Sequence, residues 1–196
     1  MSIVTLVSGG LDSTLMAVLT KEAGVSQFPL FVNYGQRALA QELASCRRAL
    51  RTNHLPEAVV ADIGGFGHLI RSGLTDPGLP VMEAAFTPGR NLLFLLLGAA
   101  HACQVGAHAV SIGLLNEAAS LFPDQTTHFL NGAEALLSES MGRSIKVLAP
   151  LSDFTKKDVV RLARKRKIEG TYSCHSGAKS PCGKCISCRE FHFKEN

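Results

Sequence analysis

The sequence has no apolar run long enough to cross a membrane. Its longest apolar stretch, residues 91–102, is interrupted by Gly98 and His101, whereas a membrane-spanning helix needs roughly 20 apolar residues. The chain also shows no basic region ahead of its first apolar segment, residues 3–7, and such a region is typical of a secretory signal peptide. We therefore expect no membrane partner and a cytoplasmic location.

Internal repeats and low-complexity segments are also absent from the sequence. Its 196 residues fit one domain with at most a small appendage, and a hydrophobic content of 46% is enough to form a sizeable core. We expect the chain to fold on its own.

Acidic residues are scarce at the C-terminal end, where residues 143–196 contain 13 of the 20 Lys and Arg residues but only five Asp and Glu. One interpretation is a solvated helix face beside a phosphate site, and the other is a surface for RNA or an acidic protein. Charge alone does not separate the two. We favour the first, so no nucleic-acid partner is expected.

Short β-branched and apolar segments alternate with segments of helical periodicity along the chain. This alternation predicts a doubly wound α/β fold, in which a mostly parallel five-stranded sheet is covered by helices on both faces. Predicted strands cover residues 3–7, 28–33, 57–62, 108–112 and 145–148. One predicted helix begins at residue 11, and three others cover residues 37–50, 91–105 and 156–167.

Two segments, residues 63–89 and 113–124, interrupt this alternation. Both are long for connections within a compact domain. Ligands of open α/β sheets bind beyond the carboxyl ends of the strands, which is where these segments must lie. We expect them to form the walls of a ligand site.

A turn with two glycines, here called the phosphate loop, joins the first predicted strand to the first predicted helix. Glycine lets the backbone approach a ligand closely, and the N–H groups and dipole at a helix start attract an anion. We predict that the loop binds phosphate, with Asp12 either holding Mg²⁺ or orienting the loop. Its residues are Ser8, Gly9, Gly10, Leu11, Asp12, Ser13 and Thr14.

The phosphate loop lacks the Gly-Lys-Ser/Thr ending of a Walker A loop, which argues against cleavage at the γ-phosphate. Its string Ser-Gly-Gly-x-Asp-Ser instead resembles the PP-loop of the ATP pyrophosphatases, which include amidating synthetases and tRNA thiolation enzymes. The resemblance implies that ATP is split to AMP and pyrophosphate while a substrate oxygen is adenylated.

Two basic residues are candidates for neutralising the leaving pyrophosphate. Arg90 follows a Pro-Gly pair, and Lys156 begins the last predicted helix. An ordinary surface cation is the alternative for each. With Asp12 and Ser13 they form the predicted catalytic set.

Four of the six cysteines are concentrated in one C-terminal segment, and disulfides are not expected in a cytoplasmic chain. Thiolates spaced Cys-x7-Cys-x2-Cys-x2-Cys close a tetrahedral Zn²⁺ site with no open position, so we predict a structural zinc; an iron–sulfur cluster is the alternative. We do not assign His175 to the metal, and Cys46 and Cys103 are expected to pack in the core. The predicted ligands are Cys174, Cys182, Cys185 and Cys188.

Together these motifs resemble the 7-cyano-7-deazaguanine synthase family (QueC) over nearly the whole chain. The resemblance rests on residues 8–14, 34–37 (Tyr-Gly-Gln-Arg), 88–91 (Pro-Gly-Arg-Asn) and the cysteine segment. It implies an ATP-dependent C–N ligase that uses Mg²⁺, contains structural Zn²⁺ and forms a homodimer. In that family, the carboxylate of 7-carboxy-7-deazaguanine is adenylated, ammonia converts it to an amide, and a second adenylation leads to the nitrile.

The resemblance also implies site residues and a division of the chain. Arg37 is expected to bind ATP, and Tyr34 and Gln36 are expected at the deazaguanine substrate. We expect residues 1–170 to form the ATP-binding PP-loop domain and residues 171–196 to form the zinc-binding segment.

The chain departs from the family in the loop after the fourth strand. Family members resemble Asp-x-Ser-Gly-Tyr-Pro-Asp-Cys-Arg, whereas residues 118–126 read Ala-Ala-Ser-Leu-Phe-Pro-Asp-Gln-Thr. Phe122 is still expected to stack on the base and Asp124 to accept its hydrogen bonds. The lost loop arginine leaves Arg37 or Arg90 to pair with the substrate carboxylate.

We expect the changed loop to affect the nitrile-forming second half of the reaction more than the adenylation of the carboxylate. The main alternative is a QueC-like ligase that joins a deazaguanine carboxylate to another amine, such as a protein N-terminus. Two further alternatives are less favoured: a tRNA thiolation enzyme, which needs a reactive thiol near ATP, and a non-enzymatic nucleic-acid module.

Overall fold

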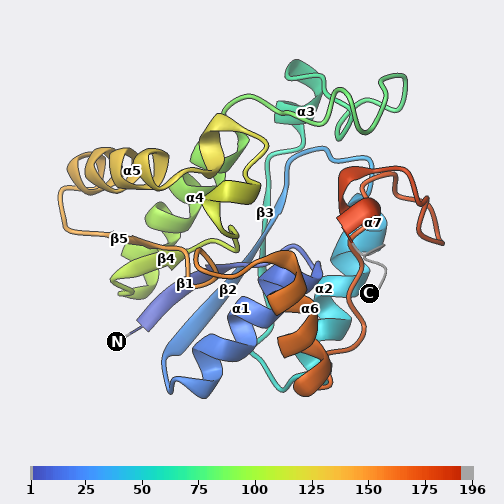
Figure 1. The fold of residues 1–196 in the computed structure, drawn as a ribbon. Coiled ribbons are helices and arrows are strands. Elements are labelled where there is room, and N and C mark those ends of the chain that lie inside the picture. Colours follow the sequence, from blue (N-terminus) through green and yellow to red (C-terminus); the bar gives the residue numbers. More distant parts are fainter. Residues whose placement is uncertain (1, 191–196) are drawn as a thin grey trace.

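Five parallel strands form one sheet in the order β3-β2-β1-β4-β5 (Figure 1). The structure is a computed structural model and describes residues 2–190. The order reverses between β1 and β4, and ligand sites of doubly wound sheets lie at such a switch point. The prediction of a five-stranded parallel sheet is confirmed. The strands are β1 (Ser2–Leu6), β2 (Ser26–Asn33), β3 (Val59–Asp62), β4 (Ala109–Ser111) and β5 (Lys146–Leu148).

Helices cover both faces of this sheet, as Figure 1 shows. One face carries α1 (Leu11–Glu22), α2 (Leu39–Thr52) and α6 (Lys156–Lys165). The opposite face carries α4 (Arg90–Val105) and α5 (Thr127–Ser140). Shorter helical segments lie in the connections and the C-terminal segment: α3 (Gly65–Leu69), η1 (Glu117–Ala119), η2 (Pro123–Gln125) and α7 (Ile186–Glu190).

The sheet is buried on both faces because its strands alternate their apolar side chains between two layers of helices. Val4 and Leu6 of β1 pack toward α4 and α5, while Phe31 of β2 packs toward α1 and α2. The helix α4 lies close to the sheet at Gly98, where an added Cβ would come within 2.4 Å of the Val110 side chain. The apolar stretch around residues 91–102 is therefore a buried helix, as predicted. Among residues 2–190, none of the helices combines the length and apolarity of a membrane span.

The predicted boundaries need small corrections, and three helices were not predicted. The helix expected over residues 37–50 begins at Leu39, and the one expected to reach Lys167 ends at Lys165. Thr155 and Asp158 form a capping box that starts α6 at Lys156. The helices α3, α5 and α7 were missed.

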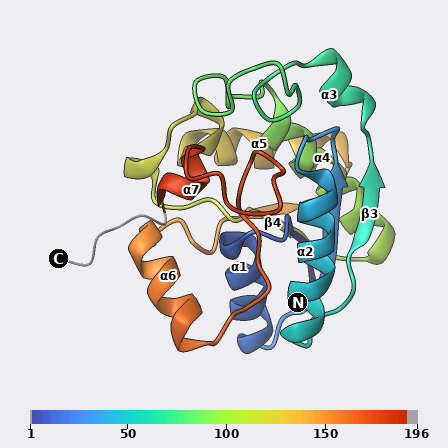
Figure 2. The same cartoon turned by 90° about the vertical axis from the view of Figure 1, so that its right-hand side faces the viewer.

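The C-terminal segment runs back over the carboxyl end of the sheet, between α1 and α2 (Figure 2). Ser45 of α2 donates to the carbonyl of Gly170 at 2.8 Å, and the backbone N–H of Tyr172 donates to the carbonyl of Gly9 at 2.9 Å. The division into residues 1–170 and 171–196 stays a prediction, and residues 1 and 191–196 lie outside the described part of the chain.

Candidate active site

The phosphate loop is fixed by hydrogen bonds among its own residues. Ser13 Oγ accepts from the Ser8 N–H at 3.1 Å and donates to the Gly10 carbonyl at 3.3 Å. The Gly10 N–H donates to Ser8 Oγ at 3.3 Å. Gly10 has no side chain to cap α1, and among the described residues Ser173 Oγ accepts from the first N–H of that helix, that of Leu11. The next N–H groups of the first turn are left for an anionic ligand.

Gly9 of the phosphate loop faces α2 rather than the ligand site. Its φ is +80°, and an added Cβ would lie 2.5 Å from the Glu42 carbonyl and 2.6 Å from the Cys46 nitrogen. Glycine is required here by the close approach of α2 and by the left-handed backbone. Gly9 therefore shapes the loop, and its expected contact with phosphate stays a prediction.

Asp12 and Lys156, two of the predicted catalytic residues, form an ion pair. The Lys156 ammonium lies 2.8 and 2.9 Å from the two Asp12 carboxylate oxygens, and 3.2 Å from a carboxylate oxygen of Glu190 in α7. Lys156 is buried, with 7% of its surface exposed. The pair joins the starts of α1 and α6, which favours a loop-orienting role for Asp12.

A cavity of about 250 Å³ lies beside the phosphate loop, beyond the carboxyl ends of β1, β2 and β4. Its wall contains apolar side chains of the strands, such as Leu6, Leu30 and Val32, and polar or charged side chains of the loops. Apart from the cysteines, the cavity brings together most of the predicted site residues, which come from three separate parts of the chain. Those on its wall are Ser8, Gly10, Leu11, Asp12, Ser13, Tyr34, Gln36 and Arg90.

Arg90, at the start of α4, projects over two aromatic rings of this cavity. Its guanidinium carbon lies 5.7 Å from the Tyr34 ring centre and 6.0 Å from that of Phe94, which are cation–π distances. One guanidinium nitrogen donates to the Tyr34 hydroxyl at 3.4 Å. Its Nε is buried and has no partner within residues 2–190. The guanidinium is therefore held in place by the two rings while its Nε–H can still donate a hydrogen bond to a ligand.

Gln36 supports the cavity wall from inside the protein. Its side chain accepts from the Tyr34 N–H at 2.9 Å and donates to Glu42 at 3.1 Å and to the Val32 carbonyl at 3.2 Å. These bonds engage the amide, so Gln36 positions Tyr34 and Glu42; its expected contact with substrate stays a prediction. Burial raises the pKa of the Glu42 carboxyl against the opposing hydrogen bond from Gln36. The sequence analysis missed Glu42, which lies on an ordinary helical stretch.

A second cavity, of about 490 Å³, adjoins the first at Asp12, Gly113 and Leu114. It lies between the loop after β4 and α7. The loop approaches the start of α1 so closely that a Cβ at Gly113 would be 3.3 Å from the Ser13 nitrogen. Other residues on its wall are Met82, Asn116, Ser120, Leu121, Gln125, Lys156, Arg189 and Glu190.

The two residues expected to bind the base, Phe122 and Asp124, lie on the wall of neither of these cavities. Phe122 instead packs against Phe86, with ring centres 5.2 Å apart. The backbone carbonyl of Asp124 accepts from the Asn91 side chain at 3.0 Å. This packing fixes the loop so that its neighbours, Ser120, Leu121 and Gln125, are the residues that reach the second cavity.

Arg37 and Thr14 are also absent from the walls of these two cavities. The Arg37 guanidinium donates to the Gly73 carbonyl at 3.4 Å, and its backbone N–H donates to the Leu74 carbonyl at 2.8 Å. Thr14 is buried in α1. Arg37 therefore ties the segment after β2 to the long connection after β3 in this structure.

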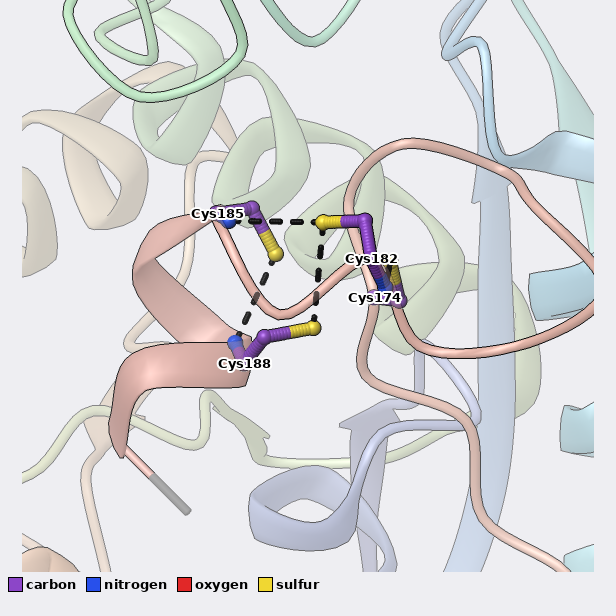
Figure 3. A group of neighbouring side chains, drawn as sticks. All are labelled: Cys174, Cys182, Cys185 and Cys188. Carbon is purple, nitrogen blue, oxygen red and sulfur yellow. Dashed lines mark hydrogen bonds between the residues drawn. The ribbon is translucent and has the colours of Figure 1, made fainter. Parts of the chain in front are cut away.

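The four predicted cysteine ligands converge, as Figure 3 shows, and their sulfur atoms all lie within 4.8 Å of one another. Backbone N–H groups of Lys184 and Cys185 each lie 3.4 Å from Cys182 Sγ. Burial opposes ionisation of this thiol, but those N–H groups, together with hydrogen bonds from the Cys174 and Cys185 side chains, lower the pKa of Cys182 to about 6. Four convergent sulfurs, one of them readily ionised, fit a tetrahedral thiolate-bound metal.

The cysteine segment also carries side chains into the first cavity. Ser173 Oγ accepts from the Leu11 N–H at the start of α1, at 3.3 Å. His175 lies on the cavity wall with a buried Nδ1 that has no partner among the described residues. Burial, together with the nearby charges of Arg90 and Lys156, lowers the pKa of His175 to about 4. The sequence analysis left His175 without a role, because adjacency to a cysteine does not show which way an imidazole points.

Comparison with known proteins agrees with this geometry. The family model described as "Queuosine biosynthesis protein QueC" matches residues 2–194. The chain belongs to the QueC family. A 7-cyano-7-deazaguanine synthase from Methanothrix thermoacetophila is 34% identical over 203 residues, covering 95% of this chain and 90% of the relative. One from Picrophilus torridus is 36% identical over 203 residues, covering 94% of this chain and 83% of the relative.

A solved structure supports the fold of this QueC-family chain. It is described as a predicted subunit of tRNA methyltransferase from Methanocaldococcus jannaschii, with a TM-score of 0.55 and 16% sequence identity. The match covers 84% of this chain and 74% of the other. At this identity the likeness concerns the fold alone, and the resemblance to the family noted from sequence is confirmed by the family match.

Proposed function

We propose that this protein is a 7-cyano-7-deazaguanine synthase, which adenylates the carboxylate of 7-carboxy-7-deazaguanine with ATP and amidates it with ammonia on the way to the nitrile. The observation that carries the proposal is the junction of two cavities at Asp12, on the phosphate loop. One cavity suits a nucleotide and the other suits the acyl substrate. The names of its family relatives supply the substrate class.

We place ATP in the first cavity in one orientation. The apolar part of the wall at Leu6, Leu30 and Val32 suits the adenine, and the phosphate loop suits the phosphate chain. Arg90 and Lys156 place positive charge where pyrophosphate leaves the α-phosphorus. Mg²⁺ bound to the phosphate oxygens would supply further positive charge, while Asp12, whose carboxylate is paired with Lys156, orients the loop.

The reaction then requires two adenylations of the same carboxyl group. In the first, a carboxylate oxygen attacks the α-phosphorus of ATP and pyrophosphate leaves; ammonia then attacks the acyl carbon, and AMP and a proton leave to give the amide. In the second, the amide oxygen attacks the α-phosphorus of another ATP, pyrophosphate and a proton leave, and loss of AMP and the remaining N–H proton gives the nitrile. Each step uses the same pair of neighbouring cavities, so the base stays in the second cavity while nucleotides exchange in the first.

In this account, the second cavity binds the deazaguanine through Ser120 and Gln125, with Arg189 as the cation nearest its mouth. These residues take the place of the expected contacts Phe122 and Asp124, and Arg189 takes the place of Arg37 or Arg90 as the partner of the carboxylate. Arg189 is exposed and no partner of its guanidinium is found within residues 2–190. A charge-assisted pair with a carboxylate would satisfy it.

A thiolation activity fits the site less well. Such chemistry needs an ionisable thiol near ATP. Cys46 lies beneath Gly9, and burial raises its pKa to about 12. Cys103 lies on the wall of neither cavity and packs against the main core.

An amide-forming ligase with a larger amine is the second candidate. Leu121, on the wall of the second cavity, is 61% exposed. An exposed apolar side chain at the mouth suits a peptide amine better than ammonia. A structural Zn²⁺ in the four-cysteine site, a homodimer and a cytoplasmic location belong to either candidate.

The test is mass spectrometry of the products from purified protein, ATP, Mg²⁺, 7-carboxy-7-deazaguanine and ammonium. We expect 7-cyano-7-deazaguanine with AMP and pyrophosphate. Accumulation of the amide, with faster turnover of a peptide amine than of ammonium, would favour the second candidate. No deazaguanine product with any amine would contradict both.

A further inference from the structure

The first cavity contains two buried polar atoms that have no partner within residues 2–190. They are Arg90 Nε and His175 Nδ1. Both residues form part of the cavity wall. A buried polar atom without a hydrogen bond costs free energy, so a pair of them on one cavity points to a polar ligand.

The backbone around His175 is held firmly at this position. The backbone N–H of His175 donates to the thiol of Cys185, one of the four convergent cysteines. Two residues later, Gly177 has a φ of +74°, and an added Cβ would lie 2.6 Å from the Arg37 carbonyl. On the other side, Ser173 binds the start of α1. The imidazole therefore cannot leave the cavity by a simple shift of its loop.

The charged groups around His175 indicate that a polar ligand of this cavity is an anion. The charges of Arg90 and Lys156 both act on the imidazole, and the phosphate loop forms the adjoining wall. An anion placed among these groups would be attracted by both cations and by the N-terminal end of α1. It would also lie within reach of the imidazole.

We propose that His175 is an ATP-contacting residue, whose Nδ1–H donates a hydrogen bond to the phosphate chain held between the phosphate loop and Arg90. This inference rests on the proposed use of ATP and goes beyond it, because it assigns part of the nucleotide site to the cysteine segment. The segment thus contributes a ligand contact as well as stability. Arg90 Nε is the second donor for the same anion.

Two variants of equal size test the contact. His175→Leu removes the hydrogen-bonding atoms, whereas His175→Asn keeps a side-chain N–H close to the position of Nδ1. Binding of α,β-methylene-ATP with Mg²⁺, which cannot be cleaved between the α- and β-phosphates, is measured by calorimetry. Zinc content and thermal unfolding are measured on the same samples. The matched control is His101→Leu, because His101 Nε2 is also buried without a partner but lies in α4 away from both cavities.

We expect His175→Leu to raise the Kd at least roughly ten-fold, the size of one hydrogen bond to a charged group. His175→Asn should recover most of this loss, and His101→Leu should bind like the wild type. Equal binding by His175→Leu and the wild type would overturn the inference while leaving ATP use intact. Equal weakening in the Leu and Asn variants with loss of zinc from both would also overturn it. A wild type that binds no nucleotide would overturn the proposed function itself.

Discussion

The Lys156 ammonium lies 2.8 and 2.9 Å from the two carboxylate oxygens of Asp12, although the two residues are 144 positions apart in the chain. Each stands in the first turn of a helix, Asp12 in α1 and Lys156 in α6. The carboxylate belongs to the phosphate loop and lies where the two cavities meet. The pair thus fixes the phosphate loop against the basic helix at the centre of the site.

Removing the Lys156 ammonium should therefore lower both the rate of adenylation and the stability of the protein. Lys156→Met leaves the Asp12 and Glu190 carboxylates near each other without the cation between them. We expect adenylation to fall at least 100-fold and the free energy of unfolding to fall by about 1–3 kcal/mol, since Asp12 remains partly solvated. Pyrophosphate release and urea unfolding measure the two effects. The control is Lys157→Met at the next, exposed position of α6, and equal effects of both variants would contradict this role.

Gly9→Ala should destabilise the protein through the phosphate loop. The new methyl group would collide with the backbone of α2 at 2.5 and 2.6 Å and would require a left-handed conformation. We expect a loss of about 2–4 kcal/mol in the free energy of unfolding. Gly132→Ala in α5 is the control, because nothing lies within 4 Å of its added Cβ and alanine favours a helix. Chemical denaturation measures the free energy of unfolding of both variants. A Gly9→Ala protein as stable as the wild type would contradict the predicted collision with α2.

The metal site should couple to the nucleotide cavity as well as to stability. Cys185→Ser removes one of four convergent sulfurs and the partner of the His175 N–H. We expect loss of one bound zinc per chain, a lower unfolding temperature and weaker binding of α,β-methylene-ATP. Elemental analysis and calorimetry measure these together. Cys103→Ser, outside the cluster, should retain zinc; a stable Cys185→Ser protein with full nucleotide affinity would contradict the coupling.

Sequence patterns located most of the fold because they arise from local chemistry. The alternation of apolar strands and periodic helices gave the sheet, and the string of residues 8–14 gave the turn between β1 and α1. The close cysteine spacing gave the cluster, since residues a few positions apart must lie near each other. The helix α5 was missed although Phe129, Leu130, Ala133 and Leu137 have helical spacing, and Thr126 caps its start.

Long-range packing decided the parts that could not be read from the sequence. Phe122 faces Phe86, from a separate connection, and this contact turns the loop after β4 so that Gln125 reaches the cavity. His175 lies on the wall of the first cavity because residues 171–175 cross the phosphate loop. Neither relationship has a local sequence signal.

Substrate binding should depend on the second cavity rather than on Asp124. We expect Arg189→Ala to weaken binding of 7-carboxy-7-deazaguanine roughly ten-fold, because the carboxylate loses a charge-assisted partner. Asp124→Ala should change the Kd less than two-fold, because only the backbone of that residue makes a described hydrogen bond. Arg161→Ala on the exposed face of α6 is the control for net charge. Calorimetry measures both Kd values. A larger loss of affinity in Asp124→Ala than in Arg189→Ala would instead support binding of the base by Phe122 and Asp124.

The central claim is that the phosphate loop cleaves ATP between the α- and β-phosphates. The most direct measurement is separation of the nucleotide products formed from α-labelled ATP, with and without 7-carboxy-7-deazaguanine and ammonium. Labelled AMP should form only with the deazaguanine present, together with pyrophosphate, and Ser13→Ala should reduce its rate at least 100-fold because Ser13 closes the loop through Ser8 and Gly10. Labelled ADP as the product, or AMP formation that is unchanged by Ser13→Ala, would contradict the account.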